Sequence, residues 1–386
     1  MRIARFVCAV IMAAIVFGPA QAATINYSFV EIANTNGEYS SLSDPSLNDN
    51  GEAAFRASLD AGGATVQRGD GTAMQEIATT GAEFVDILGP VSINNSGVVA
   101  FKALHRTDWE SVNAGDGTTT QEIANSLGAF GTFIGAPSIN NNGLVAFTSN
   151  LDAGGQAVSV GDGSTTQEIA NTAGAFSSFA LPTINDSGEV AFRAGLDAGG
   201  RSVNVGDGMT TQEYVNTAGP LMDISTPQPS INNNGDVAFS ASLDAGGLSI
   251  NIADGMSVME IANTDGEFSS FGRPSLNDNG DVAVIAVLDT GDRVLGVFSG
   301  GAFNEVIRVG DMLNGLVIVD LFFGAEGLNN QGALAFLAEF SDGSRAIFRA
   351  DPGEVPLPAA LPLFLAGLAG FGLIRRRSVS SRLRGT

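Results

Sequence analysis

The sequence predicts an all-β fold, a seven-bladed β-propeller, and three observations carry this prediction. The phrase Asn-x-x-Gly, followed by an Ala-Phe-like pair, occurs seven times along the chain. The glycines of successive copies are separated by 46, 46, 45, 47, 45 and 52 residues. Each copy contains short runs of alternating apolar and polar residues, and none has a sustained helical period. Units of about 40 to 45 residues with four strands are typical of propeller blades.

Each unit is anchored by an asparagine and by a glycine three residues later. The seven pairs are Asn48/Gly51, Asn94/Gly97, Asn140/Gly143, Asn185/Gly188, Asn232/Gly235, Asn277/Gly280 and Asn329/Gly332. Most units also contain Leu-Asp-Ala-Gly-Gly and then Gly-Asp-Gly, and they close with a segment like Gln121 to Asn125, Gln-Glu-Ile-Ala-Asn. Because the period and the internal order hold together, the units are repeats of one structural element.

The fourth unit illustrates the expected strands. They span residues 182–184, 190–196, 202–206 and 213–216. Asn185 to Gly188 should form a turn, because an asparagine side chain can bond the turn and glycine can adopt positive φ. Within the second strand, small Ala191 and large Phe192 face opposite sides. That pairing suits a strand packed on both faces between neighbouring blades.

The two ends of the repeat region predict how the ring closes. The seventh unit ends at Ile347 to Arg349 and has no fourth strand of its own. An orphan copy of that strand, Phe29 to Asn34, lies at the start of the repeat region. This segment should complete the last blade and remove an exposed sheet edge. The alternative is an open β-solenoid.

Residues 1–22 read as a secretory signal peptide. Arg2 and Arg5 precede an apolar run from Phe6 to Phe17, and Ala20-Gln21-Ala22 is an A-x-A cleavage site. The repeat domain is therefore expected over residues 23–351. An uncleaved anchor helix is the alternative, but it needs about 20 apolar residues and this run is shorter.

Residues 352–386 read as a sorting segment. A hydrophobic transmembrane helix is expected over residues 357–374, and a positive stop-transfer cluster follows it at Arg375, Arg376 and Arg377. The motif before the helix consists of Val355, Pro356, Leu357, Pro358 and Ala359. Motif, helix and basic tail in this order resemble the VPLPA variant of the PEP-CTERM sorting signal. The resemblance implies that an exosortase in the inner membrane recognises the motif, cleaves near it and passes the protein onward. The alternative is a plain C-terminal anchor, which gives the same topology.

Composition and charge exclude several classes of function. Within residues 23–354, 11 basic residues face all 41 acidic residues, a formal charge of about −30. Such a surface repels phosphate backbones, so we expect no binding to nucleic acid. The single cysteine, Cys8, lies inside the signal peptide, so the mature chain has no thiol chemistry.

The Asn-x-x-Gly-x-x-Ala-Phe units resemble the choice-of-anchor NxxGxxAF tandem-repeat proteins over about residues 32–350. The resemblance implies an extracellular protein without an assigned catalytic activity, and it brings no functional residues to this chain.

The repeated turns offer two candidate sites. Asp278 and Asp281 superficially resemble ligands of a calcium loop, and calcium is the only cofactor that the sequence suggests. The equivalent Asn94 to Val98 keeps the asparagine and glycine but has no carboxylate, which favours turn chemistry. The Asp-Gly turns repeat a second set of aspartates, which should stand at one height around a closed ring: Asp70, Asp116, Asp162, Asp207 and Asp254.

A carboxylate pair in the central channel would support a carbohydrate-active enzyme. A catalytic pair needs two different environments, and repetition places aspartates equivalently. We therefore expect no enzyme and keep this activity as the alternative. A channel lined by unequal, partly buried carboxylates would favour the enzyme, whereas a channel plugged by apolar side chains would favour a binding protein.

One hairpin departs from the repeat. His105, Arg106, Asp108 and Trp109 replace the usual turn, and with Lys102 this stretch holds the only His, Trp and Lys of the chain. An exposed tryptophan beside an arginine can stack a sugar or anchor a partner, so these residues form a candidate ligand patch. The alternative is sequence drift in a tolerant surface hairpin.

Together these features predict an exported, non-catalytic structural or interaction protein. The precursor is anchored in the inner membrane with a periplasmic body, and the processed protein reaches the cell surface or the extracellular matrix. Its expected partners are the exosortase-type enzyme and extracellular polysaccharide or another surface protein.

Overall fold

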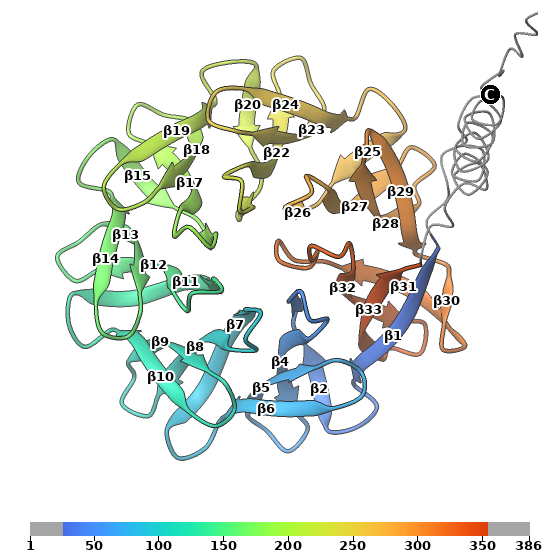
Figure 1. The fold of residues 1–386 in the computed structure, drawn as a ribbon, viewed down its shortest axis with the longest axis horizontal. Coiled ribbons are helices and arrows are strands. Elements are labelled where there is room, and N and C mark those ends of the chain that lie inside the picture. The colour runs from blue at the N-terminus through green and yellow to red at the C-terminus, as the bar shows by residue number, and fades with distance from the viewer. Residues whose placement is uncertain (1–25, 354–386) are drawn as a thin grey trace, which may run out of the picture. The chain divides into compact units, whose positions relative to one another are not determined.

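The computed structural model describes residues 26–353, which form seven β-sheet blades around a common axis (Figure 1). The predicted all-β propeller is therefore confirmed, and the open solenoid is excluded. The signal peptide, the motif at 355–359, the hydrophobic segment 357–374 and the arginines at 375–377 lie outside the described residues. Nowhere between residues 26 and 353 is there a helix with the length and apolarity to cross a bilayer.

In blades 1 to 3 the strands run from the axis outward in chain order. Blade 1 contains β2 (Tyr39–Leu42), β3 (Ser46–Leu47), β4 (Ala53–Leu59), β5 (Ala64–Gly69) and β6 (Met74–Thr79). Blade 2 contains β7 (Phe84–Ile93), β8 (Val99–His105), β9 (Glu110–Gly115) and β10 (Thr120–Asn125). Blade 3 contains β11 (Phe130–Ile139), β12 (Val145–Leu151), β13 (Gln156–Gly161) and β14 (Thr166–Asn171).

Blades 4 to 6 repeat this order, each with an inner strand in two pieces. Blade 4 contains β15 (Phe176–Phe179), β16 (Thr183–Ile184), β17 (Val190–Leu196), β18 (Arg201–Gly206) and β19 (Thr211–Asn216). Blade 5 contains β20 (Leu221–Ile224), β21 (Ser230–Ile231), β22 (Val237–Leu243), β23 (Leu248–Ala253) and β24 (Val258–Asn263). Blade 6 contains β25 (Phe268–Phe271), β26 (Ser275–Leu276), β27 (Val282–Leu288), β28 (Arg293–Ser299) and β29 (Ala302–Arg308).

Blade 7 is built from both ends of the described chain. It contains β31 (Leu316–Phe322), β32 (Leu334–Phe340) and β33 (Arg345–Pro352), and its outermost strand is β1 (Tyr27–Asn34). The register pairs Phe29 with Ala350 and Asn34 with Ala346. The orphan segment therefore closes the ring as the sequence predicts. The pairing runs to Pro352, one residue beyond the expected domain boundary at 351.

The fourth unit shows where the sequence missed a strand. Three of its four expected strands match β16, β17 and β18 within one residue, and β19 begins two residues earlier than expected. The sequence reading does not include β15, which pairs with β17 ahead of β16. The hydrophobic stretch 310–323 of the seventh unit also has its own structure, because β30 (Met312–Leu313) forms a hairpin with β31.

Apolar packing between blades explains why the second strands alternate small and large residues. Phe192 is fully buried in a cluster with Val158 of blade 3, and Ala191 is fully buried in a cluster with Val237 of blade 5. Burial of one such aromatic side chain contributes about 1.5–3 kcal/mol. The core is thus a series of interfaces between blades, and each blade depends on both neighbours.

The register also places two sets of turns on one face of the ring. Ala53, which follows the first Asn-x-x-Gly turn, pairs with Gly69, which precedes the first Asp-Gly turn. Both turns therefore lie at the same end of blade 1. We call the face of the ring that carries these turns the axial face. On it the Asn-x-x-Gly turns surround the axis, and the Asp-Gly turns lie farther out.

Candidate functional site at the propeller axis

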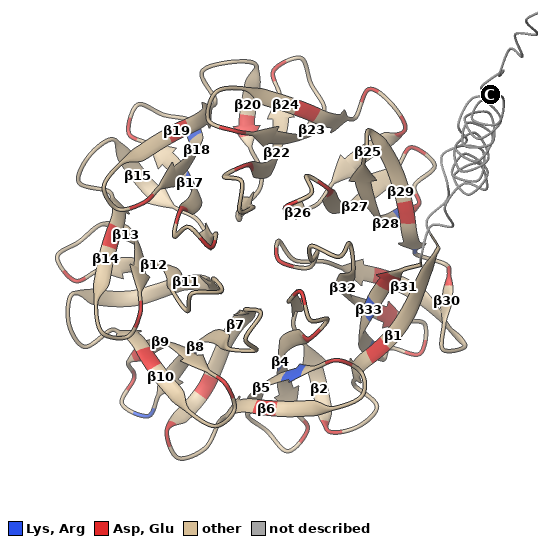
Figure 2. Ribbon diagram, in the orientation of Figure 1, with Lys and Arg blue, Asp and Glu red and all other residues tan. Residues whose placement is uncertain are grey.

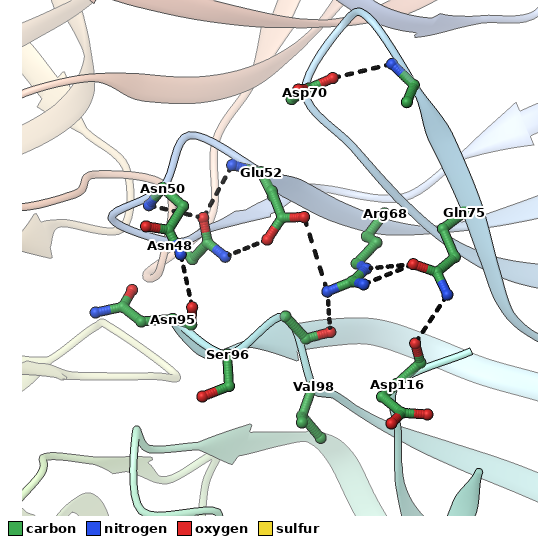
Figure 3. A network of polar contacts seen from close by, with 12 residues as sticks. Asn48, Asn50, Glu52, Arg68, Asp70, Gln75, Asn95, Ser96, Val98 and Asp116 are labelled. Atoms are coloured by element: carbon green, nitrogen blue, oxygen red, sulfur yellow. Dashed lines mark hydrogen bonds and ion pairs between the residues drawn. The ribbon is translucent and has the colours of Figure 1, made fainter. Parts of the chain in front are cut away.

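The Asn-x-x-Gly turns surround the axis and have one hydrogen-bonding pattern. In blade 1, Oδ1 of Asn48 accepts the backbone N–H groups of Asn50 at 3.0 Å and Glu52 at 2.9 Å (Figure 3). Gly51 has a φ of +79°, which a residue with a side chain rarely adopts. The same two bonds to the leading asparagine occur in the other six turns.

The amide group of each leading asparagine also reaches the next blade. Its Nδ2 donates to the backbone carbonyl of the next leading asparagine, at 2.8 to 3.2 Å in all seven cases. The seventh bond, from Asn329 to the carbonyl of Asn48, returns to blade 1. These bonds form a closed ring, which we call the inner ring. It consists of Asn48, Asn94, Asn140, Asn185, Asn232, Asn277 and Asn329.

The inner ring explains why this position is always asparagine. Its side chain must accept two N–H groups with one atom and donate to a carbonyl with another. Aspartate supplies the acceptor but no donor, and its charge would face a carbonyl oxygen. The sequence reading recognised the turn but not the bond to the next blade, because that bond joins residues 45 to 52 positions apart.

A second closed ring uses the residue after each leading asparagine. Its backbone N–H donates to Oδ1 of the corresponding side chain in the next blade, at 2.7 to 2.9 Å. We call this the outer ring. Its members are Asp49, Asn95, Asn141, Asp186, Asn233, Asp278 and Asn330. Either residue type can serve here because only an oxygen is required.

The outer ring also separates its carboxylates from one another. Asn233 Nδ2 donates to Oδ2 of Asp186 at 3.1 Å and to Oδ2 of Asp278 at 3.0 Å. Asn330 likewise bridges Asp278 and Asp49, at 2.9 and 3.2 Å. Asp and Asn cannot alternate strictly around a ring of seven positions, so at least one pair of neighbours must be of the same residue type. That pair is the two neutral amides Asn95 and Asn141 rather than two charges.

Inside these rings lies a cavity of about 150 Å³ on the axis, the axial cup. Six units place a hydroxyl side chain in its wall, two residues before the leading asparagine: Ser46, Ser92, Ser138, Thr183, Ser230 and Ser275. The seventh unit has Gly327 at this position, and the neighbouring Glu326 lines the cup instead. Oxygens Oε2 and Oε1 of Glu326 accept the hydroxyls of Ser46 at 3.2 Å and Ser138 at 2.6 Å.

Glu326 is the functional candidate that the sequence reading missed. Burial raises the pKa of its carboxyl group, and the hydroxyls of Ser138, Ser92 and Ser46 act in the opposite direction. The side chain is half-buried because it faces the cup, while protein atoms surround it on its other sides. The sequence does contain a signal for Glu326, because the seventh unit lacks the hydroxyl residue that the other six units have at this position. The axis is therefore polar and holds unequal carboxylates, not an apolar plug.

Glu326 also lines a smaller hollow of about 30 Å³. Arg273 and Asp44 line it, with 3.6 Å between Nη2 and Oδ2. Burial raises the pKa of the Asp44 carboxyl, and the charge of Arg273 opposes this rise. Glu326 lines both the cup and this hollow, and so stands between them.

The aspartates of the Asp-Gly turns do not line the cup. Asp70 Oδ1 accepts the backbone N–H groups of Thr72 at 2.8 Å and Ala73 at 3.0 Å. Bonds from the Thr72 hydroxyl and from these two amides lower the pKa of Asp70 to about 2. Hydrogen bonds, chiefly from backbone amides, also lower the pKa values of the equivalent Asp116, Asp162, Asp207 and Asp254. Each of these repeated aspartates therefore caps its own turn. Figure 2 shows acidic residues on turns all around the propeller.

The weak calcium candidates are separate and already bonded. Asp278 accepts the Asn233 backbone at 2.8 Å and the amides of Asn233 and Asn330. Asp281 accepts Nδ2 of Asn277 at 3.2 Å. Residues 26–353 contain no group of three or more His, Cys, Asp or Glu that could hold a metal ion. The two aspartates therefore do not fit a calcium site, because they belong to no such group and amides occupy both oxygens of Asp278 and Oδ2 of Asp281.

The candidate ligand patch in blade 2 is partly inside the protein. His105 is buried, stacks on half-buried Trp109 with ring centroids 3.4 Å apart, and bonds the hydroxyl of Ser111 at 2.8 Å. Burial lowers the pKa of its imidazole, although nearby glutamates oppose this. His105 therefore lies beneath Trp109 inside the hairpin, and Trp109, which was expected to be exposed, is half-buried. The nearby Lys102 donates to the carbonyl of Phe133 in blade 3 at 2.8 Å.

Arg106 and Asp108 of the same hairpin are exposed. The guanidinium of Arg106 donates to the backbone carbonyls of Gly81 and Ala82. Asp108 adopts a left-handed backbone conformation with a φ of 58° and forms the tip of the turn. Arg106 therefore ties the hairpin to the preceding loop, and Asp108 shapes the turn through its backbone.

Fold and axis together define a seven-bladed propeller assembled from tandem repeats. The sequence profile of DUF7453, described as a family of unknown function, matches residues 30–324. The chain belongs to this family. A comparison with curated protein sequences gives no match.

Solved structures share the fold at low identity. An oligogalacturonate lyase in complex with manganese matches with a TM-score of 0.56 and 10% identity, over 85% of this chain and 98% of that one. The oligogalacturonate lyase from Vibrio parahaemolyticus matches with a TM-score of 0.56 and 12% identity, over 88% and 100%. The propeller domain of the Trilobed protease from Pyrococcus furiosus, described as having an open velcro topology, gives 0.56 and 11%, over 83% and 100%. These likenesses establish the propeller fold.

Proposed function

We propose that this propeller is an exported, non-catalytic structural or interaction protein of the cell surface or extracellular matrix. The observation that carries the proposal is the use of the repeated polar groups around the axis. In the inner and outer rings these polar groups form hydrogen bonds to the next blade, and the bonds hold the blades together. A closed ring of this kind is a rigid scaffold that presents its turns and outer strands to a partner.

The chain ends support export and sorting. A signal peptide at residues 1–22 and a VPLPA-type motif at residues 355–359 would place the propeller outside the inner membrane, where an exosortase-type enzyme processes it. A surface charge of about −30 in residues 23–354 suits an extracellular partner that is not a polyanion. Neutral polysaccharide or another surface protein meets that condition.

Cell fractionation with intact-mass analysis tests export and sorting. The expected species begins at Ala23, lacks the segment after about Pro358 and is found outside the cell or on its surface. A species that keeps Ile374 and the following arginines in the inner membrane would instead be a plain anchored protein. A cytoplasmic species with residues 1–22 attached would overturn the proposal.

A carbohydrate-active enzyme is the second candidate, and Glu326 favours it. Its raised pKa and its place in the axial cup, below the carboxylates of Asp49, Asp186 and Asp278, give the unequal carboxylates that such an enzyme needs. The acidic surface and the carboxylates of the cup would repel a polyanionic substrate, so neutral oligosaccharides are the first substrates to test. Turnover by the wild type that Glu326→Gln abolishes would establish the enzyme and refute the non-catalytic proposal.

A further inference from the structure

The crevice between blades 1 and 2 on the axial face is filled by one arginine. Arg68 Nη1 donates to the carbonyl of Gly97 at 2.8 Å, and its Nε and Nη2 donate to Oε1 of Gln75 at 3.2 and 2.6 Å (Figure 3). Glu52 lies 3.7 Å from Nη1. The guanidinium thus binds across the crevice to the glycine carbonyl of the neighbouring turn.

The crevice between blades 7 and 1 is filled in the same way. Arg349 occupies the position of Arg68, and its Nη1 donates to the carbonyls of Gly51 at 2.5 Å and Asp70 at 3.2 Å. Its Nε and Nη2 pair with the carboxylate of Asp351 at 2.7 and 3.0 Å. Two crevices therefore show how this fold accommodates a guanidinium group.

The crevice between blades 3 and 4 has no such arginine. Val160 stands at the equivalent position, directly before Gly161 of β13, and a cavity of about 200 Å³ lies beside it. We call this cavity the open crevice. It is lined by Leu144, Val160, Gly161, Asp162, Thr165, Gln167, Ile169, Ser187, Gly188 and Asp207.

The open crevice retains the acceptors that hold arginine elsewhere. Gly188 and Asp207 of blade 4 correspond to Gly51 and Asp70 of blade 1, and both line the cavity. The described residues donate no hydrogen bond to the carbonyl of Gly188. The hydrogen bond from Gln167 Nε2 to the carbonyl of Asp207 is long, at 3.5 Å.

The matching glutamine bonds in two other crevices are shorter. Gln75 Nε2 lies 3.0 Å from the carbonyl of Asp116, and Gln121 Nε2 lies 3.0 Å from the carbonyl of Asp162. The glutamine of the open crevice is therefore loosely held, and its Oε1 can accept a donor as Oε1 of Gln75 does.

We infer that the open crevice is a binding site for a guanidinium group, specifically the arginine side chain of a partner protein. The guanidinium would donate to the carbonyls of Gly188 and Asp207 and to Oε1 of Gln167, while its alkyl chain packs on Leu144 and Val160. This inference rests on the crevice geometry and holds whether or not the protein is exported.

Charge and shape favour arginine over lysine. The exposed carboxylates of Asp162 and Asp207 stand at the rim, in a chain with 41 acidic and 18 basic residues. The acceptors are spread around the cavity, which suits the planar fork of a guanidinium. An ammonium group offers the same charge without that fork.

The first experiment titrates the purified protein with N-acetyl-arginine amide and, as matched control, N-acetyl-lysine amide, at constant ionic strength. NMR signals of the Gln167 side-chain amide report on the site. The arginine probe should shift these signals, and the lysine probe should bind at least about tenfold more weakly. Equal responses to both probes, or none up to tens of millimolar, would overturn the inference.

Variants then locate the site. Val160→Arg should fill the crevice from within and abolish the response, whereas Val160→Leu should retain it. The reverse test is Arg68→Val, which opens the blade 1–2 crevice. It should lower the melting temperature, and the arginine probe should restore more of the loss than the lysine probe. A response that persists in Val160→Arg, or the absence of rescue in Arg68→Val, would contradict the inference.

A last comparison distinguishes the sources of the guanidinium. A capped Gly-Arg-Gly peptide that binds more tightly than free arginine supports a partner protein. Tighter binding of free arginine would assign the crevice to a small guanidino compound and overturn the protein partner.

Discussion

The two sets of turns on the axial face carry similar side chains but perform different tasks. In the Asn-x-x-Gly turns, one oxygen caps the turn and the amide nitrogen bonds the next blade. In the Asp-Gly turns, the carboxylate caps only its own turn. A polar residue repeated near the axis thus couples blades, because neighbouring turns meet there. Farther out, the Asp-Gly turns meet the preceding blade only through their backbone carbonyls, and the bonds of their carboxylates stay within the turn.

The largest expected effect comes from breaking the inner ring. Asn140→Asp keeps the turn acceptor but removes the donor to the Asn185 carbonyl and places a buried charge against it. The free energy of unfolding should fall by about 2–4 kcal/mol, measured by urea denaturation. The reverse exchange in the outer ring, Asp278→Asn, is the control and should change stability far less. Equal losses in both variants would contradict the difference between the rings.

A smaller effect should follow from placing charges together in the outer ring. Asn233→Asp removes the amide that bridges Asp186 and Asp278 and sets three carboxylates in a row. The loss should be about 1 kcal/mol at low salt and should shrink as salt screens the charges. Asn141→Asp creates only one like-charged neighbour, Asp186, and should lose about half as much. A salt-independent loss would argue against this explanation.

Glu326→Gln should raise the free energy of unfolding, whereas Asn140→Asp and Asn233→Asp should lower it. The folded-state pKa of Glu326 is raised, so the folded protein binds the proton more tightly than the unfolded chain. Stability therefore falls as pH rises from the ordinary value of 4.5 through the folded pKa. Thermal melts should show a larger gain for Glu326→Gln at pH 8 than at pH 5. The control is Glu267→Gln, which removes one carboxylate from the exposed surface.

The smallest effect is expected at the Asp-Gly turns. The pKa of Asp70 is lowered to about 2, so its contribution is complete above the ordinary value of 3.8 and is lost as pH falls between these values. Asp70→Asn keeps an acceptor oxygen and should leave stability at pH 7 nearly unchanged. It should reduce the acid-induced loss between pH 4 and pH 2, measured by thermal melts. A large loss at pH 7 would mean that the carboxylates of these turns also couple blades.

These contrasts show which features were accessible from the sequence. The repeat period predicted seven blades, and the orphan strand Phe29 to Asn34 predicted the closure of the ring. Both follow from local pattern and from the need to remove a sheet edge. The two rings were not predicted, because they depend on distances between turns about 46 residues apart. Glu326 escaped notice since it enters the axis one position away from the serine that it replaces.

Hydrogen exchange at the outer ring tests the central claim most directly. The backbone N–H of Asn141 belongs to an exposed residue yet donates to Asp186 of the next blade, whereas the N–H of Ser164 donates to Asp162 within its own turn. If the rings hold the propeller closed, the Asn141 amide should exchange at least about 100-fold more slowly than the Ser164 amide, relative to their intrinsic rates. Equal protection of these two amides would mean that the axial turns open independently, and the account of ring closure would be wrong.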